Sequence, residues 1–426
     1  MSESNLRPGN IRNFTIKGED LSGNKTEHRN SSALVDLRYY ENVLSNVITL
    51  SVGVQETDDL LNALPILGGD KVDIKIEDSS GNVLRPTLYV NQITNVVSDT
   101  TESDYFLHLA SKELFKNDKT RVVQRYDGKI SDNVKKIMKE KLSADVDVDE
   151  TLINYNFIGN NRKPLYVCSW LASKSVPATA GKLGGAAGYL FFENQKGFQF
   201  KSIDGLFKEP KQPSPKKYIL TSTPFAPRGY DGKILNYSID RDIDLSNNLA
   251  IGMYSNKSIF FNFYDYDYVH KDYTVEDNKQ DNAGRDSVLS SISNFGNDPS
   301  RIMSRILDVG TLPLGKTTED QLKAWKEDPT NPTFNAPQTM VQSVMRYNQM
   351  FAIKINITIA ADFSLKAGDL IYCDFPEVST NKNSGVDKRS GGIYMISSVC
   401  HRLTSNQSST NLTLVRDTFG RKPFKV

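Results

Sequence analysis

Apolar and polar residues alternate with a period of two near both ends of the chain, which predicts half-buried strands. In the first region the alternation covers 47–54 and 70–77, and in the second it covers 352–359 and 368–375. A Gly-Asp pair precedes the later strand of each region and favours a turn there: Gly69-Asp70 in the first, Gly368-Asp369 in the second. The two ends of the chain therefore carry the same predicted strand, turn and strand.

The similarity between the two regions continues downstream. The segment 88–90 (Leu-Tyr-Val) matches 393–395 (Ile-Tyr-Met), and 105–109 matches 411–415 as a closing strand. We interpret this order as an internal duplication of a small antiparallel β-barrel, with one copy near 1–120 and the other within about 340–418. The alternative is chance similarity between unrelated alternating strands.

Helical spacing is confined to the middle of the chain. On the segment 130–142 a single apolar face predicts a helix that begins at an N-cap, Ser131 or Asp132. The pattern also predicts a short helix in 163–172, a hairpin over 188–200 that turns at 194–197, two short helices in 285–307 with Asp298 as a cap, and a helix over about 339–350.

These elements predict an α+β fold that is mainly β, with two similar antiparallel β-barrel domains and α+β connecting domains. The expected divisions are 1–120 for the first barrel, 121–222 for an α+β connecting domain, 223–262 with 340–418 for a discontinuous second barrel, 263–339 for a helical or irregular insertion, and 419–426 for a tail.

Composition narrows the function classes. The 52 Lys and Arg residues balance 51 Asp and Glu, so no global charge attracts nucleic acid or an anionic membrane. The chain contains no apolar run of about 18 residues and has no signal-peptide pattern, so we expect no stable membrane insertion. Three scattered cysteines and four histidines form no disulfide framework or metal motif. We therefore expect no catalytic, cofactor-binding or metal-binding residues and no cofactor.

The segment 310–317, GTLPLGKT, satisfies the phosphate-loop pattern. A phosphate loop needs convergent backbone N–H groups between a strand and a helix, whereas Pro313 removes one N–H and the preceding 302–307 has helical spacing. We expect a helix–loop–helix connection here. A nucleotide hydrolase that uses Lys316 and Thr317 stays as the alternative.

Two further motifs have competing interpretations. The acidic run 145–150 resembles a calcium loop, but Glu150 occupies the position that requires Gly, so a solvated acidic loop is expected. The run 260–268 alternates aromatic and acidic residues and would display Tyr264, Tyr266 and Tyr268 on one strand face. Such a face suits packing against a neighbouring domain or subunit, or else sugar binding in a carbohydrate-binding or wall-degrading protein. His401 is expected near a strand end in a structural role.

The order of elements resembles the central baseplate hub of contractile-tailed bacteriophages. It is also similar to phage late-control proteins and to the hub part of the type VI secretion spike. The residues that carry the resemblance are 361–376, 391–402 and 410–417, with the helix-into-strand entry before them and the helix 127–138 after the first barrel.

This resemblance implies a structural protein without enzymatic activity, located in the virion at the tail baseplate after assembly in the host cytoplasm. It implies a homotrimer whose six barrels form a pseudo-six-fold ring between a three-fold spike and a six-fold tube. The implied partners are the central spike protein, tail-tube or tube-initiator proteins and baseplate wedge proteins, without sequence-specific nucleic acid. The spike and any wall hydrolase are expected to be separate proteins.

Overall fold

Strands predominate in the structure, which confirms the mainly β fold. The computed structural model describes residues 9–19, 25–29, 33–57, 66–99, 101–152, 154–178, 186–208, 214–221, 230–240, 245–262, 266–274, 296, 298–306, 336–376, 387, 390–418 and 420. No helix in these ranges is long and apolar enough to cross a membrane.

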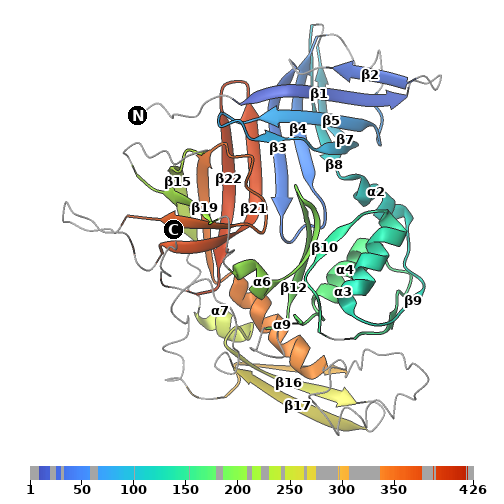
Figure 1. The fold of residues 1–426 in the computed structure, drawn as a ribbon, viewed down its shortest axis with the longest axis vertical. Coiled ribbons are helices and arrows are strands. Elements are labelled where there is room, and N and C mark those ends of the chain that lie inside the picture. The colour runs from blue at the N-terminus through green and yellow to red at the C-terminus, as the bar shows by residue number, and fades with distance from the viewer. Residues whose placement is uncertain are drawn as a thin grey trace.

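One sheet contains fourteen strands (Figure 1). Its main path runs in the order β15 (Ile234–Asp240), β19 (Ile353–Ala360), β22 (Ser408–Arg416), β21 (Gly392–Thr404), β3 (Leu34–Asn42), β4 (Thr49–Glu56), β8 (Ser103–Ala110), β7 (Thr87–Ser98), β5 (Lys71–Glu77), β1 (Asn10–Glu19) and β2 (Lys25–Arg29). Off this path, β20 (Leu370–Asp374) pairs with β21, β14 (Lys216–Ile219) with β20, and β6 (Val83–Leu84) with β5.

The main path consists of the same four-strand unit twice. We call β3, β4, β8 and β7, with β5 beside them, the first module, and β15, β19, β22 and β21, with β20, the second module. Leu50 faces Leu109 in the first module as Ile355 faces Leu414 in the second. Two irregularities agree as well: β3 and β15 both shift register after their first residue, and β7 and β21 both shift after Val90 and Ile396. A second shift in β7, between Thr94 and Val97, has no counterpart in β21. Chance alternation does not explain a shared order, register and bulge position.

The two predicted barrels are not found as closed units in the described residues. The first half of β21 pairs with β20, and its second half, from Ser398 to Thr404, pairs with β3. Because one long strand serves both modules, the sheet continues from one module to the next.

The sequence matches downstream of the turns were wrong by one residue. Tyr89 faces Lys71, and the residue in the same place of the second module is Met395, opposite Leu370. The closing strands shift likewise, so that Leu109 corresponds to Leu414. A one-residue slip in a strand moves a side chain to the opposite face, and Tyr394 accordingly lies in the core of its module.

Helices and small sheets occupy the rest of the described chain. The helices are α2 (Lys112–Lys119), α3 (Ile130–Ile137) with a π-helical turn at Met138–Leu142, α4 (Pro164–Ala172), α6 (Ile203–Phe207), α7 (Leu245–Ala250) and α9 (Ala336–Met350). The small sheets are β10 (Val146–Val148), β13 (Gly197–Ser202) and β12 (Tyr189–Asn194); β11 (Phe157–Ile158) and β9 (Arg125–Tyr126); and β17 (Asp267–Thr274), β16 (Ser255–Asn262) and β18 (Arg301–Ile306).

Several predictions in the middle of the chain hold. The apolar face of 130–142 is fully buried, and the hairpin β12–β13 turns at Gly197, whose φ is 102°. Helix α9 leads into β19 as expected and packs against β16 (Figure 1). The predicted N-cap was wrong, since helix α3 begins after Lys129 without a side-chain cap.

Three segments differ from the prediction. Residues 301–306 form strand β18, parallel to β16, where helical spacing predicted a helix. Met303 is buried in this strand while Ile302 and Ile306 are exposed, so the apolar spacing reflects no helical face. Strand β16, assigned to the 223–262 part of the second barrel, belongs to the separate three-stranded sheet, and β14, assigned to the connecting domain, joins the second module through β20.

Candidate assembly site at the module junction

The motifs considered in the sequence form no common site in the part of the chain that the structure describes. The GTLPLGKT segment lies outside the described residues, as do 285–295. A phosphate loop follows a strand, and the preceding residues form strand β18 and not the predicted helix, so this argument against a phosphate loop no longer applies. The other argument stays, because Pro313 has no backbone N–H to donate. In the part of the chain that the structure describes, no three His, Cys, Asp or Glu side chains are grouped to hold a metal ion.

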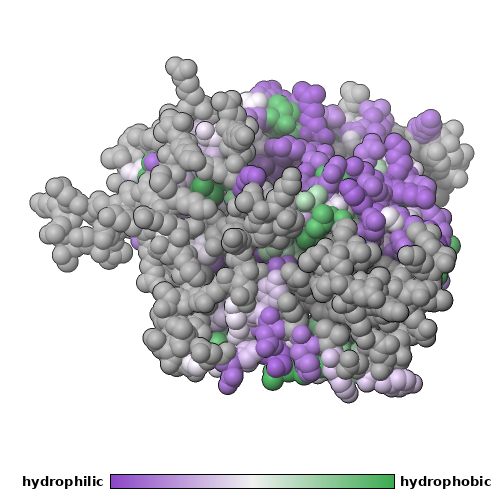
Figure 2. Space-filling view, turned by 60° about the horizontal axis from the view of Figure 1, so that its bottom comes forward, coloured by the Kyte–Doolittle hydropathy of each residue, from purple (hydrophilic) through white to green (hydrophobic). Residues whose placement is uncertain are grey.

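The acidic and aromatic runs both belong to paired strands. Residues 146–148 form β10 instead of a loop, and Lys201 pairs with Asp147 and Asp149. The two ends of the aromatic run, 260–262 and 267–268, belong to the antiparallel strands β16 and β17, so the predicted single strand is wrong. Tyr264 lies outside the described residues. Tyr266 and Tyr268 are exposed and their rings contact Phe261 at centroid distances of 6.4 and 5.2 Å. In the view of Figure 2, hydrophobic residues form small separate groups among hydrophilic ones.

The side chains that do converge lie where the two modules meet. Strands β3 and β21 pair antiparallel over seven residue pairs, from Asn42 with Ser398 to Asp36 with Thr404. On the core side, Leu37 faces Leu403, and both are buried in the core of the first module. On the other side, Arg38 faces Arg402, and Asp36 lies within 2.6 and 3.1 Å of their two guanidinium groups. The carboxylate offsets the repulsion between the two arginines.

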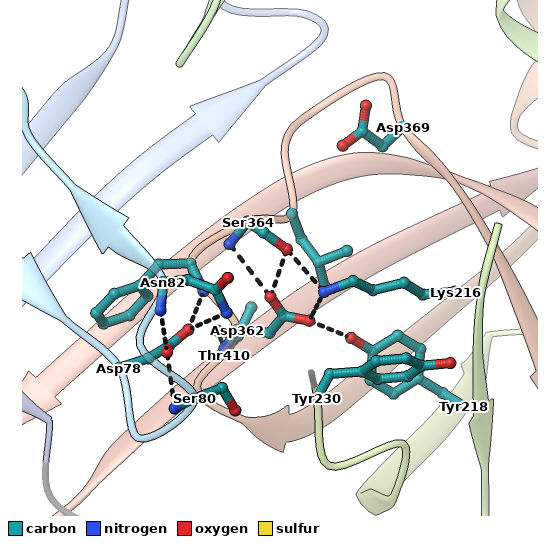
Figure 3. Close-up of polar contacts among 12 residues, drawn as sticks. Asp78, Ser80, Asn82, Lys216, Tyr218, Tyr230, Asp362, Ser364, Asp369 and Thr410 are labelled. Carbon is teal, nitrogen blue, oxygen red and sulfur yellow. Dashed lines mark hydrogen bonds and ion pairs between the residues drawn. The ribbon is translucent and has the colours of Figure 1, made fainter. Parts of the chain in front are cut away.

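Asp78 connects the first module to the second (Figure 3). It follows β5 and is buried, and its carboxylate accepts hydrogen bonds from the backbone N–H groups of Ser80 and Asn82 at 2.9 and 2.8 Å. It also accepts one from the backbone N–H of Phe363, 2.9 Å away in the segment that connects β19 to β20 of the second module. A carboxylate in this position fixes its own turn and holds the neighbouring backbone at the same time.

Asp362, next to that contact, is the centre of a buried network in the second module (Figure 3). Its carboxylate accepts hydrogen bonds from Lys216 Nζ at 2.6 Å, Tyr218 OH at 2.7 Å and Ser364 Oγ at 2.6 Å. Burial alone would raise the pKa of Asp362, but the Lys216 ammonium and these donors outweigh it and hold the pKa below its usual value. The network attaches β14 to the second module.

His401 completes the junction as a neutral side chain. It is fully buried in β21 between the rings of Tyr39 and Phe363. Burial lowers its pKa to about 4. Because the Leu365 carbonyl can only accept, Nε2 carries the proton and donates to it at 3.3 Å, and Nδ1 accepts from Thr410 Oγ1 at 2.9 Å. The expected structural role of His401 is confirmed.

Two buried glutamates join the connecting region to the modules. Glu41 on β3 accepts hydrogen bonds at 2.8 Å from the backbone N–H groups of Gln195, in the β12–β13 turn, and of Ala367, in the turn before β20. Glu193 on β12 accepts from the Ile48 N–H at 2.9 Å and from Ser111 Oγ at 2.5 Å. Burial raises the pKa of each glutamate to about 7.

The face of the modules opposite their cores has a polar part and an apolar part. In the second module, β20 and the first half of β21 bury apolar residues on this face under β12, α6 and α9. Elsewhere on this face, cross-strand hydrogen bonds connect hydroxyl, amide and imidazole groups: Thr358 to Asn411 at 2.9 Å, Thr413 to Asn356 at 3.0 Å, and Thr94 to His108 at 2.9 Å. Since alternate residues of a strand point to opposite faces, the same strands bury aliphatic residues on the core side. Where β19 pairs with β22 and β7 with β8, the modules thus form a wall with a hydroxyl-rich and amide-rich surface.

Sequence reasoning missed the junction residues. The run Asp78-Ser-Ser-Gly-Asn82 has the composition of a turn capped by its own aspartate, which could have identified Asp78. No sequence signal shows that Phe363, 285 residues later, donates to the same carboxylate.

No family model and no curated protein matches the chain. Solved structures, in contrast, match the chain. A tail protein from Neisseria meningitidis MC58 is 11% identical with a TM-score of 0.50, and the match covers 95% of this chain and 97% of that one. The 43 kDa tail protein of prophage MuSo2 from Shewanella oneidensis is 10% identical with a TM-score of 0.52, covering 95% and 98%. This chain has the fold of phage tail proteins.

The phage tail fold extends over nearly the whole chain, so both modules and the connecting region belong to it. An E. coli component of the type VI secretion system, described as similar to T4 tail proteins, also matches, at 9% identity over 96% of this chain and 79% of that one. Its TM-score of 0.43 is too low to carry the comparison further.

Proposed function

We propose that the chain is a structural hub of a contractile phage tail baseplate, without enzymatic activity. In this role three copies form a ring of six modules, with the three-fold central spike below and the six-fold tail tube above. The proposed location is the virion, at the tail baseplate, and the proposed contacts are with the spike, with tube or tube-initiator proteins and with baseplate wedge proteins.

The observation that carries the proposal is the repeated module. Three identical chains present three equivalent surfaces, whereas a tube with six-fold symmetry needs six. Two modules with one strand order, register and bulge position supply six similar surfaces from three chains. The phage tail fold supports this use of the repeat, and the hydroxyl-rich and amide-rich wall suits the inner surface of a ring through which other molecules pass.

Light scattering and electron microscopy of the purified protein test the proposal. At micromolar concentrations we expect a mass about three times 47.7 kDa and class averages that show a ring with six similar densities. A chain that stays monomeric at all concentrations, or rings with another number of densities, would contradict it.

The nucleotide hydrolase remains the rival because β18 ends shortly before the GKT residues. Calorimetric titration with magnesium-ATP separates the two functions. The hub requires no saturable binding, whereas binding that disappears in Lys316→Ala would favour the hydrolase.

A further inference from the structure

The turn before β5 has the same structure as the turn before β20. It spans 67–70 in the first module and 366–369 in the second. In each turn the carboxylate of the last residue, an aspartate, accepts the backbone N–H of the first residue, at 2.8 Å in the first module and 3.2 Å in the second. The N–H of the same aspartate donates to the carbonyl of the first residue, at 3.2 Å in both. The second residue of the turn is Gly68 in the first module and Ala367 in the second.

The second module has its turn covered. Ala367 is fully buried and both of its backbone polar groups have partners. Its N–H donates to the carboxylate of Glu41 at 2.8 Å, and its carbonyl accepts from Asn194 Nδ2 at 3.0 Å. Phe192 lies in the same buried cluster. Asn194 and Phe192 both belong to the hairpin β12–β13, so a hairpin with an amide and an aromatic ring, together with a carboxylate, completes this turn.

The first module leaves the equivalent turn open. Gly68 is exposed, and a Cβ placed on it would meet no atom within 4 Å. Its N–H and C=O have no hydrogen-bond partner among the residues that the structure describes. Leu67 beside it is 46% exposed. The turn forms one side of a cavity of about 610 Å³, and strands β1 and β2 form the other. A cavity of this volume can hold a short peptide segment.

Positive charge predominates in the cavity. Three lysines line it, one from each of β1, β2 and β5, together with two carboxylates: Lys17, Lys25, Lys71, Glu27 and Asp70. Lys17 and Lys71 also pair with Asp73, at 2.9 and 3.1 Å. Lys25 has no ion-pair partner within the described ranges. An ammonium group beside the open N–H of Gly68 favours a carboxylate, because hydrogen bonds to an ionised acceptor are the stronger ones.

We propose that this cavity is a docking site for an acidic β-hairpin of another protein, which covers the first turn as β12–β13 covers the second. A carboxylate of the partner accepts from Gly68 N–H and pairs with Lys25, and an amide of the partner donates to Gly68 C=O. The partner thereby supplies the two hydrogen bonds that Ala367 already has. The contact needs one chain only, so it does not depend on the proposed ring.

NMR of the glycine amides locates the contact. In the full chain labelled with nitrogen-15 at glycine, the signal of Gly68 is identified by its loss in Gly68→Ala. This substitution fits the turn, since alanine stands at the equivalent position 367 and the space around Gly68 is open. The signal of Gly69 is identified in the same way, and Gly368 reports on the covered turn.

The probe is a disulfide-closed peptide that copies residues 190–201 of the hairpin β12–β13. Leu190→Cys and Lys201→Cys close it, because these two residues lie directly opposite each other in the hairpin. Lys196→Glu makes its tip acidic. We expect a saturable shift of the Gly68 and Gly69 signals on titration with this peptide and no shift of Gly368, whose place is already filled. A second closed peptide that keeps Lys196 and carries Glu193→Lys is basic and should produce no shift.

Charge reversal in the cavity tests the recognition. Lys25→Glu should weaken binding of the acidic peptide by about ten-fold or more, because a charge-assisted contact becomes a repulsive one. Lys135→Glu is the matched control, since Lys135 is an exposed lysine on α3 and does not line the cavity, and it should leave the affinity unchanged. Circular dichroism checks that both variants are folded.

Each outcome decides the proposal. Saturable shifts at Gly68 and Gly69 that Lys25→Glu weakens and Lys135→Glu does not weaken support the docking site. No shift at these glycines, equal binding of the acidic and the basic peptide, or equal effects of the two lysine variants would overturn it. The trimer mass in light scattering is measured without peptide, so the proposed function stands or fails separately.

Discussion

The two modules share their sheet and differ in what covers it. In each, a Gly-Asp turn is held by two backbone hydrogen bonds to the long strand, between Gly69 or Asp70 and Val90 in the first module and between Gly368 or Asp369 and Ile396 in the second, all at 2.8–2.9 Å. Around the first turn there is open space, with no atom within 4 Å of a Cβ placed on Gly69. At Gly368 the same Cβ would lie 2.9 Å from Phe192 of the hairpin β12–β13.

The strands are repeated in the two modules, whereas the elements that cover them are not. The outer side of the second module forms a buried cluster with β12, α6 and α9, whereas the equivalent side of the first module has no such cover in the described residues. The repeated features are strand order, register, bulges and edges, which are the features that determine pairing with another module. The coverings differ between the two modules, and in the proposed ring this difference would leave a three-fold symmetry.

The largest loss of stability is expected from a substitution in the elements that cover the second module. Arg346 on α9 is buried and bonds to Asp204 Oδ1 at 2.9 Å and Asp417 Oδ2 at 2.6 Å. Arg346→Ala would remove the cation that two buried carboxylates share, so the free energy of unfolding should fall by about 3–5 kcal/mol. Chemical denaturation measures it. Arg12→Ala, which breaks the exposed pair with Glu77 in the first module, should cost about 1 kcal/mol or less.

The next largest loss of stability is expected at the junction between the modules. Asp78→Ala removes the acceptor shared by Ser80, Asn82 and Phe363, and it should lower the free energy of unfolding by about 1–3 kcal/mol because buried donors lose their partner. Asp99→Ala is the control, since Asp99 caps an exposed turn of its own and contacts no other module. Equal losses in the two variants would show that the Phe363 contact adds nothing.

Alanine substitutions at Gly69 and Gly368 test the difference between the two turns directly. Both residues have a left-handed backbone, with φ of 97° at Gly69 and 89° at Gly368, so alanine should cost about 1–2 kcal/mol of backbone strain at each. Only Gly368→Ala also collides with Phe192, which should add about 1–3 kcal/mol. Thermal unfolding of the two variants measures the difference. If Gly69→Ala were the more damaging, the first turn would not be open as described.

The smallest effect concerns pH. The pKa of Glu41 rises to about 7 in the folded chain from 4.5, so the folded chain binds an extra proton between these values. Its contribution to stability is therefore present at low pH and lost as pH rises through 7. In Glu41→Gln the Tm, measured relative to the parent, should rise by a few degrees from pH 5 to pH 8. A difference in Tm between Glu41→Gln and the parent that does not change with pH would contradict the account.

Sequence periodicity predicted the repeated part of the fold well. Strict alternation over 71–77 and 353–360 and the two Gly-Asp turns were visible because each strand buries one face and each turn needs a positive φ. The one-residue error at Tyr394 arose because two tyrosines were matched by identity, whereas strand pairing places Tyr89 and Met395 at equivalent positions.

The junction could not be predicted in the same way. Lys216, Asp362 and Asp78 come from distant segments, and only the pairing of β3 with β21 and of β14 with β20 brings them together. The strand β18 was missed because an exposed strand with Ile302 and Ile306 on its surface imitates helical spacing. A periodic apolar pattern indicates which face of a strand or helix is buried. It carries no information on which modules pair with each other.

The central claim is that one chain supplies two equivalent positions of a six-fold ring. The most direct test is electron microscopy of the purified protein, followed by fitting of both modules into the ring. We predict a trimeric ring in which adjacent modules are related by about 60°, within a chain and between chains alike. A ring in which the rotation between chains differs clearly from the rotation within a chain would contradict the claim.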